Sequence, residues 1–176
     1  MISNPLSNIT KLDSQNFNEF GLTGCLNFFQ VNFIDTKIKT VGGNCEDSVN
    51  IINSLGQIKD INILNASSDA LDVDFSKLEI LNMNITNARN DCFDVSTGKY
   101  FVDNALLKNC GDKGVSVGEA SDFKGLQINV SDTKIGISSK DSSVSNIQSF
   151  LGKNIDLCFE AYQKKQEFFG AQLFIQ

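Results

Sequence analysis

A repeat of 22 residues is the feature that most constrains the fold of this chain. Two largely apolar columns recur at this offset, with one polar column between them. The first holds Val49, Leu71, Phe93, Val115, Ile137 and Phe159, and the second holds Ile51, Val73, Val95, Val117, Ser139 and Ala161. Alternation at a period of two is typical of a half-buried strand. We therefore expect the same short strand six times, with the same two side chains directed inward.

A second apolar group follows each of these strands, in the pattern apolar-x-x-apolar-x-apolar. Its members are Ile58, Ile61, Ile63; Ile80, Met83, Ile85; Val102, Ala105, Leu107; and, shifted by one residue, Phe123, Leu126, Ile128. Asn65, Asn87 and Asn109 then fall in one column, which Ser131 continues. Asparagine tolerates left-handed backbone, and identical amides stacked one rung apart can bond to each other. The column therefore predicts an asparagine ladder.

These features predict an all-β, single-stranded right-handed parallel β-helix with about 22 residues per rung and roughly six to seven rungs. The competing fold is a leucine-rich repeat, which also has a period near 22. It is disfavoured because the inward residues are mostly Ile, Val and Phe and no helical face is visible. Residues 1–20 are expected to form an N-terminal cap or leader, and residues 21–176 the β-helix. The last residues, FFGAQLFIQ, form an apolar strand pattern, so we expect this end to continue in a longer protein or to pack against a partner, through self-association or a further domain.

Composition excludes several classes of function. The chain has no histidine, which rules out Ser-His-Asp catalysis, and its net charge of −6 with no basic run argues against nucleic-acid binding. No apolar stretch is long enough for membrane insertion, and the N-terminus shows no secretion signal. Five cysteines without C-x-x-C spacing argue against a zinc site and a full disulfide framework, so most are expected to be small buried hydrophobes. We expect no metal site and no cofactor.

Acidic residues concentrate in two columns that are expected to point outward. Asp47, Asp69 and Asp91 lead to Lys113 in one column, while Asp72 and Asp94 lead to Ser116 and Ser138 in the other. Carboxylates one rung apart repel, so at least one pKa should be raised unless Lys113 or a cation compensates. The candidate catalytic residues are Asp69, Asp91 and Lys113, and the candidate ligand-binding residues are Asp72, Asp94, Ser116, Ser138 and Lys140. The alternative is that the aspartates are turn residues bonded to backbone and that Lys113 neutralises them.

The strings SDALDVD, NDCFDVSTG, GDKGVSVGE and KIGISSK, over about residues 67–140, resemble central rungs of the polygalacturonase-like glycoside hydrolases. In that resemblance Asp69, Asp91 and Lys140 match family positions. Asn90, Lys113 and Ser138 stand where the family has Asp, His and Arg. An inverting glycosidase needs a carboxylic acid donor, which Asn90 cannot supply, so ordinary hydrolysis is not expected. Lys113 could instead abstract a proton next to a carbonyl, as in a lyase or epimerase.

The rungs over about residues 45–170 also resemble β-helix segments of large bacterial surface and polysaccharide-associated proteins. That resemblance implies a cell-surface or extracellular setting and a carbohydrate-facing or scaffolding role. The favoured function is thus a non-catalytic module that binds carbohydrate or a partner, and polysaccharide is the expected ligand. A polysaccharide-active enzyme and a structural spacer are the alternatives. The uniformly short turns disfavour the enzyme, because catalysis needs loops that form a cleft.

Overall fold

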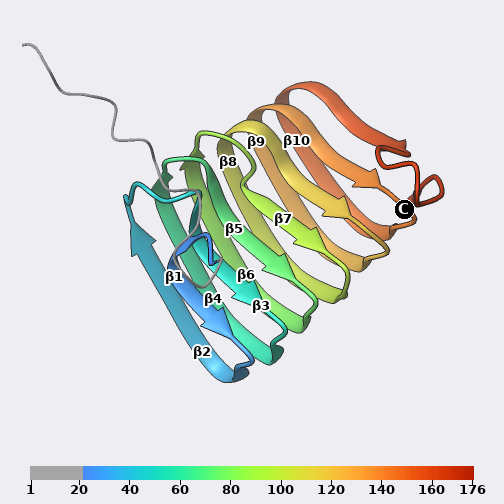
Figure 1. Cartoon of the computed structure of the whole chain (residues 1–176). Coiled ribbons are helices and arrows are strands. Elements are labelled where there is room, and N and C mark those ends of the chain that lie inside the picture. Colours follow the sequence, from blue (N-terminus) through green and yellow to red (C-terminus); the bar gives the residue numbers. More distant parts are fainter. Residues whose placement is uncertain (1–21) are drawn as a thin grey trace, which may run out of the picture.

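The computed structural model describes residues 22–176, and the expected cap or leader at residues 1–20 lies outside them. The described chain is a parallel β-solenoid of about six turns with about 22 residues per turn (Figure 1). Between residues 22 and 176 it consists of strands and turns, with no helix. The prediction of a parallel β-helix is therefore confirmed against the leucine-rich repeat.

The early turns each contribute one short and one long strand. The short strands are β1 (Gly24–Phe29), β3 (Asp47–Ile52), β5 (Asp69–Asp74) and β7 (Phe93–Ser96), and the long ones are β2 (Asn32–Val41), β4 (Leu55–Ala66) and β6 (Lys77–Ala88). In later turns the two merge into β8 (Lys99–Gly118), β9 (Asp122–Lys140) and β10 (Val144–Tyr162), and β11 (Gln172–Ile175) follows. All of the strands pair in parallel with strands of neighbouring turns.

The predicted inward columns form the core. Leu71 pairs with Val49 on one side and Phe93 on the other, and Phe93 pairs in turn with Val115. Val49, Leu71 and Val115 are fully buried, and Phe93 packs edge-to-face against Phe123 with 6.2 Å between ring centroids. The period of two thus places the same side chains inward over five of the six expected turns, whereas on the last one Phe159 is half-buried and Ala161 is exposed.

The predicted inward residues of the fourth apolar group are wrong, because the register of this turn differs from that of the earlier ones. Gly125, Ile128 and Val130, not Phe123, Leu126 and Ile128, pair with Val102, Ala105 and Leu107. The turn before β9 causes this, because both Glu119 and Ala120 have positive φ there, whereas Thr97 alone does so one turn earlier. One inserted residue moves the offset from 22 to 23, and it returns to 22 where Lys113 pairs with Ile135. Leu126 is therefore only half-buried.

The predicted asparagine ladder is present. Asn87 Nδ2 donates to Asn65 Oδ1 and Asn109 Nδ2 donates to Asn87 Oδ1, both at 2.8 Å. All three residues have φ between 55° and 62°, in the left-handed region. The next members of the column are Asp132 and Asn154, which bond to each other at 2.9 Å. The expected Ser131 is displaced from the column by the same inserted residue.

We expect Asn87→Ala to lower the free energy of unfolding by about 2 kcal/mol. Alanine loses both ladder bonds and pays about 1–2 kcal/mol for left-handed backbone. Asn87→Gly loses the same bonds but adopts positive φ freely, so its loss should be clearly smaller. Urea unfolding of the two variants checks this. An equal loss in both would contradict the backbone part of the explanation.

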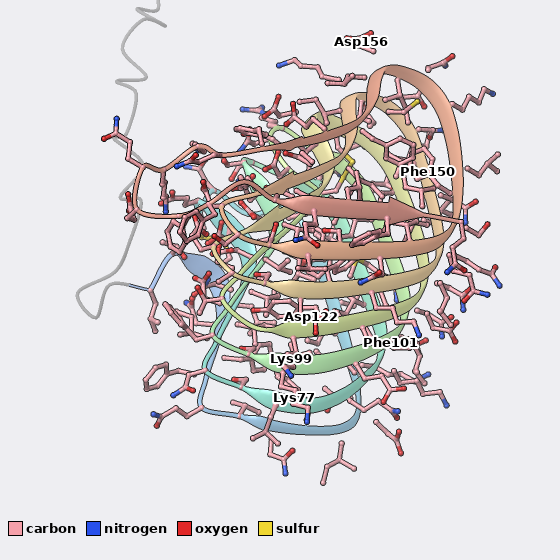
Figure 2. The ribbon with its side chains drawn as sticks, turned by 90° about the vertical axis from the view of Figure 1, so that its right-hand side faces the viewer. Lys77, Lys99, Phe101, Asp122, Phe150 and Asp156 are labelled. Atoms are coloured by element: carbon pink, nitrogen blue, oxygen red, sulfur yellow. A yellow bond between two sulfur atoms is a disulfide. The ribbon has the colours of Figure 1, made fainter. Side chains whose placement is uncertain are left out.

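The C-terminal end of the solenoid is only partly covered in the described residues. Strand β11 pairs with β10 over Val144–Ile147, and no described strand lies beyond the rest of β10. Leu151 and Leu157 are 68 % and 44 % exposed on this last turn, which Figure 2 marks by Phe150 and Asp156. Self-association or a further domain at this end stays a prediction.

Candidate functional site

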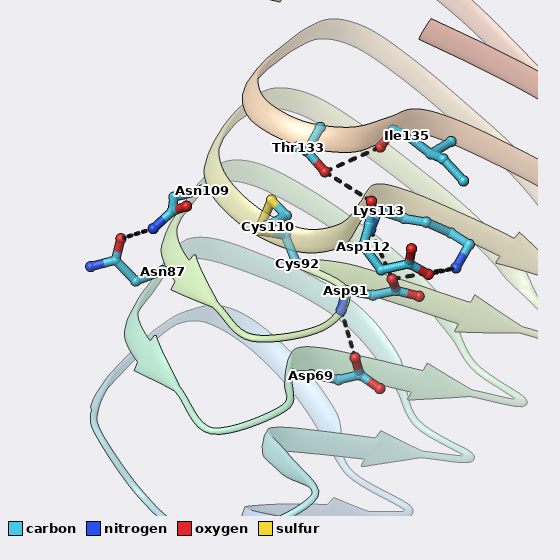
Figure 3. Close-up of a disulfide and its surroundings, with 10 residues drawn as sticks. All are labelled: Asp69, Asn87, Asp91, Cys92, Asn109, Cys110, Asp112, Lys113, Thr133 and Ile135. Carbon is cyan, nitrogen blue, oxygen red and sulfur yellow. Dashed lines mark hydrogen bonds and ion pairs between the residues drawn. A yellow bond between two sulfur atoms is a disulfide. The ribbon is translucent and has the colours of Figure 1, made fainter. Parts of the chain in front are cut away.

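The first acidic column lies where the chain enters each short strand, and the carboxylates of Asp69 and Asp91 bond to the backbone of the next turn. Asp69 Oδ1 accepts hydrogen bonds from the Asp91 backbone N–H and from Asn90 Nδ2, both at 2.7 Å. Asp91 Oδ1 accepts the Lys113 backbone N–H at 2.9 Å (Figure 3). Asn90 therefore helps to orient the Asp69 carboxylate. Each carboxylate caps backbone that its neighbouring turn would otherwise leave unpaired.

Lys113 closes this column. Its Nζ lies 3.6 Å from Asp91 Oδ1 and hydrogen-bonds to Asp112. Burial disfavours the charged ammonium, but the Asp112 hydrogen bond and the charges of Asp91 and Asp112 outweigh it, so the pKa of Lys113 is raised. A lysine that abstracts protons near neutral pH needs a lowered pKa. The contacts of Lys113 thus favour charge neutralisation.

The second column is far less exposed than expected for a ligand-binding face. Ser116 and Ser138 are fully buried, and Lys140 is only 7 % exposed. Lys140 Nζ donates to Ser116 Oγ at 2.9 Å, and Ser138 Oγ donates to Glu160 Oε1 at 2.6 Å. These polar groups are engaged with each other, so a ligand would have to displace existing bonds to reach them.

Asp72 and Asp94 belong to the same column. Asp72 Oδ2 accepts Asn50 Nδ2 at 2.9 Å, whereas Asp94 Oδ1 is buried without a hydrogen-bond partner. Burial, reinforced by neighbouring carboxylates, raises the pKa of Asp72. Burial also raises the pKa of Asp94, against the lowering effect of the Lys140 charge. The two aspartates are therefore stabilised in their neutral forms.

Burial also raises the pKa values of the carboxyl groups in the first acidic column. It raises the pKa of Asp47 and of Asp91 from 3.8 to about 7, and it raises the pKa of Asp69 despite the bonds from Asp91 and Asn90. Lys113 opposes the shift at Asp91 but does not cancel it. The expectation that stacked carboxylates raise a pKa agrees with these shifts, although desolvation is the larger cause. Among residues 22–176, no cluster of three or more acidic or cysteine side chains has the arrangement to hold a metal ion.

We expect the free energy of unfolding to fall by about 3 kcal/mol or more as the pH rises from about 4 to about 7. Folded Asp47 and Asp91 retain protons that the unfolded chain has already lost, so ionisation favours unfolding. The protonated carboxyl groups of Asp47 and Asp91 contribute their full stabilisation below about pH 4, and this contribution is lost as the pH rises past 7. The lowered pKa values of Asp60 and Asp132 act in the opposite direction but belong to exposed side chains.

Urea unfolding at several pH values measures how steeply the free energy of unfolding falls with pH. Asp91→Asn keeps an acceptor for the Lys113 backbone N–H but removes the titrating group, so its slope should be shallower than that of the wild type. Stability that increases toward neutral pH in the wild type would contradict the prediction.

The cysteines depart from the prediction, since four of the five form disulfides. Cys25 bonds to Cys45 and Cys92 to Cys110, while Cys158 is free and exposed. Each bond closes a little less than one turn, with separations of 20 and 18 residues. An odd number of cysteines gave no indication of this pairing. The signal that could have revealed it is that both separations are slightly shorter than the 22-residue repeat.

A groove that the sequence reasoning missed lies on the long strands. It is an open groove with a volume of about 750 Å³ across the starts of β4, β6, β8 and β9. Its main outward side chains are Leu55, Lys77, Lys99, Phe101, Asp122 and Lys124. Figure 2 shows Lys77, Lys99 and Asp122 on successive turns, with Phe101 beside them. We call this surface the lysine groove.

The lysine groove follows from the same repeat as the core. Leu55, Lys77, Lys99 and Asp122 pair in one outward column, and Gln57, Glu79, Phe101 and Lys124 pair in the next. The ammonium of Lys124 lies 5.9 Å from the centre of the Phe101 ring. Outward positions of the second strand, compared at an offset of 22, could have revealed most of these residues. None of the predicted site residues lines this groove.

Comparison with protein-family models, curated proteins and solved structures finds no match to the chain. The resemblance to polygalacturonase-like hydrolases gains no support from them. The described residues contain no helix of the length and apolarity needed to cross a membrane.

Proposed function

We propose that this chain is a non-catalytic module that binds an extended carbohydrate in the lysine groove. The observation that carries the proposal is the combination of a phenylalanine ring with charged and amide side chains on four successive strands. Binding sites for small and extended ligands are concave, with aromatic surface and a few polar groups that fix orientation. At about 4.8 Å between strands, the four turns span roughly 14 Å, which suits a linear oligomer.

The contacts of the predicted acidic site support this assignment indirectly. Asp69, Asp91 and Lys113 bond to neighbouring turns, and Ser116 and Ser138 are buried. The lysine groove, in contrast, has exposed side chains at Lys77 and Lys99. Two disulfides also support an oxidising compartment such as the cell surface, because such bonds persist there.

A glycan-binding screen with immobilised acidic and neutral oligosaccharides tests the proposal. Phe101→Ala should weaken binding of any retained glycan by about three- to tenfold, as expected for loss of one aromatic contact. Phe75→Ala is the matched control, because Phe75 is 61 % exposed in a turn outside the groove. Equal binding by the wild type and Phe101→Ala would overturn the assignment of the groove. If no glycan bound at all, the spacer function would take its place.

An enzyme is the second candidate, favoured by one observation. The Asp91 carboxyl has a pKa raised to about 7 and lies beside Lys113, and a general acid works best with a pKa near the operating pH. This candidate expects release of new reducing ends or unsaturated sugars from a glycan panel, and loss of that turnover in Asp91→Asn. Activity that persists in Asp91→Asn, or its absence in the wild type, would rule out this role.

A further inference from the structure

The charges in the lysine groove differ from those of the chain as a whole. Three lysines (Lys77, Lys99 and Lys124) and two carboxylates (Glu79 and Asp122) line it, so the groove has a net charge of 3 − 2 = +1, while the chain has −6. The groove is thus a locally cationic surface on an acidic protein. Such a reversal of sign attracts ligands that the rest of the surface repels.

Lys77 and Lys99 form a pair of neighbouring cations in the lysine groove. They are register neighbours on β6 and β8, so their backbones lie about 4.8 Å apart, and both side chains are exposed. No ion pair among the described residues includes either lysine. Two like charges one rung apart repel. An anionic group placed between the two ammonium groups would remove this repulsion and gain two charge-assisted hydrogen bonds.

The third lysine extends this cationic edge toward the aromatic ring. Lys124 Nζ lies over Phe101, two strands beyond Lys77. Carboxylates complete the groove, because Asp122 follows Lys99 in its column and Glu79 precedes Phe101 in the other. Carboxylates accept hydrogen bonds from sugar hydroxyls, which a phosphate chain without hydroxyl groups cannot donate. The mixture therefore fits a chain that carries hydroxyl groups as well as anionic groups, such as an acidic polysaccharide, better than a polyanion without hydroxyl groups.

We propose that the lysine groove binds a linear polysaccharide bearing carboxylate groups, which lies along the solenoid axis with one carboxylate between Lys77 and Lys99 and a sugar ring near Phe101. This inference rests on the proposed carbohydrate-binding function and adds the class of glycan. The two acidic side chains would accept hydroxyl groups of the neighbouring sugars.

The test compares matched ligands and matched variants. The probes are alginate, polygalacturonate and oxidised cellulose oligomers, each beside its carboxyl-reduced counterpart with the same backbone. We expect at least one acidic glycan to bind, and its reduced form to bind at least tenfold more weakly. The double variant Lys77→Gln with Lys99→Gln should lose about tenfold in affinity for that glycan. Lys39→Gln with Lys108→Gln changes the net charge equally at exposed sites outside the groove and should bind like the wild type.

The outcomes separate the two proposals. If acidic and reduced glycans bind equally and both depend on Phe101, the carboxylate inference fails and the carbohydrate-binding function stands. If no glycan binds, or if neither the Phe101 nor the lysine variants change binding, both proposals fail. Equal affinity for single-stranded DNA of the same charge would indicate general attraction of polyanions and would also overturn the inference.

Discussion

Replacing Phe93 with alanine is expected to lower the free energy of unfolding by about 3–5 kcal/mol. Phe93 is 1 % exposed and pairs with Leu71 and Val115 on the neighbouring turns. Its ring packs edge-to-face against Phe123. The cavity left by alanine cannot close easily, because parallel ladders on both sides fix the distance between turns. Chemical denaturation followed by circular dichroism measures the loss.

The same substitution at Phe75 is the control for Phe93. Phe75 is 61 % exposed, so Phe75→Ala should change the free energy of unfolding by no more than about 0.5 kcal/mol. A loss at Phe93 as small as that at Phe75 would show that the turns relax to fill the space. It would also contradict the explanation that the parallel ladders keep the core around Phe93 from closing the cavity.

The core could be predicted because a solenoid repeats its environment. When Leu71 and Phe93 occupy the same step of successive turns, one period describes both the sequence and the packing. The asparagine ladder was predictable for the same reason, since Asn65 and Asn87 occupy identical turns. What the period cannot show is a turn of different length. The extra residue at Glu119–Ala120 shifts the later side chains, and nothing in the composition of the strands indicates it.

The candidate site was harder to predict, because exposure depends on how neighbouring turns cover one another. Alternation correctly separates Ser116 from the inward Val115 and Val117, but it does not reveal that Lys140 reaches across and donates to the buried hydroxyl. The lysine groove posed the opposite problem. Lys99 and Phe101 are ordinary outward residues in sequence, and the groove arises from the arrangement of four strands. Its binding role stays a prediction.

Removing the disulfide between Cys92 and Cys110 is expected to lower the free energy of unfolding by about 3 kcal/mol. The bond closes residues 92–110, a loop of nearly one turn, and thereby restricts the unfolded chain (Figure 3). Both cysteines are buried, at 0 % and 2 % exposure, so alanine at both positions also leaves apolar space unfilled. Urea unfolding of the double variant Cys92→Ala with Cys110→Ala measures the combined loss.

Cys158→Ala is the matched control, because this cysteine is free and exposed and should contribute little to stability. Reduction of the wild type gives a second check. Since the buried bond is shielded in the folded state, dithiothreitol should reach it mainly when the turn opens, so reduction should be faster in urea below the unfolding midpoint than in water. If the double alanine variant unfolds at the same urea concentration as Cys158→Ala, the disulfide does not constrain this turn, and the ladders alone hold Asp91 and Lys113 together.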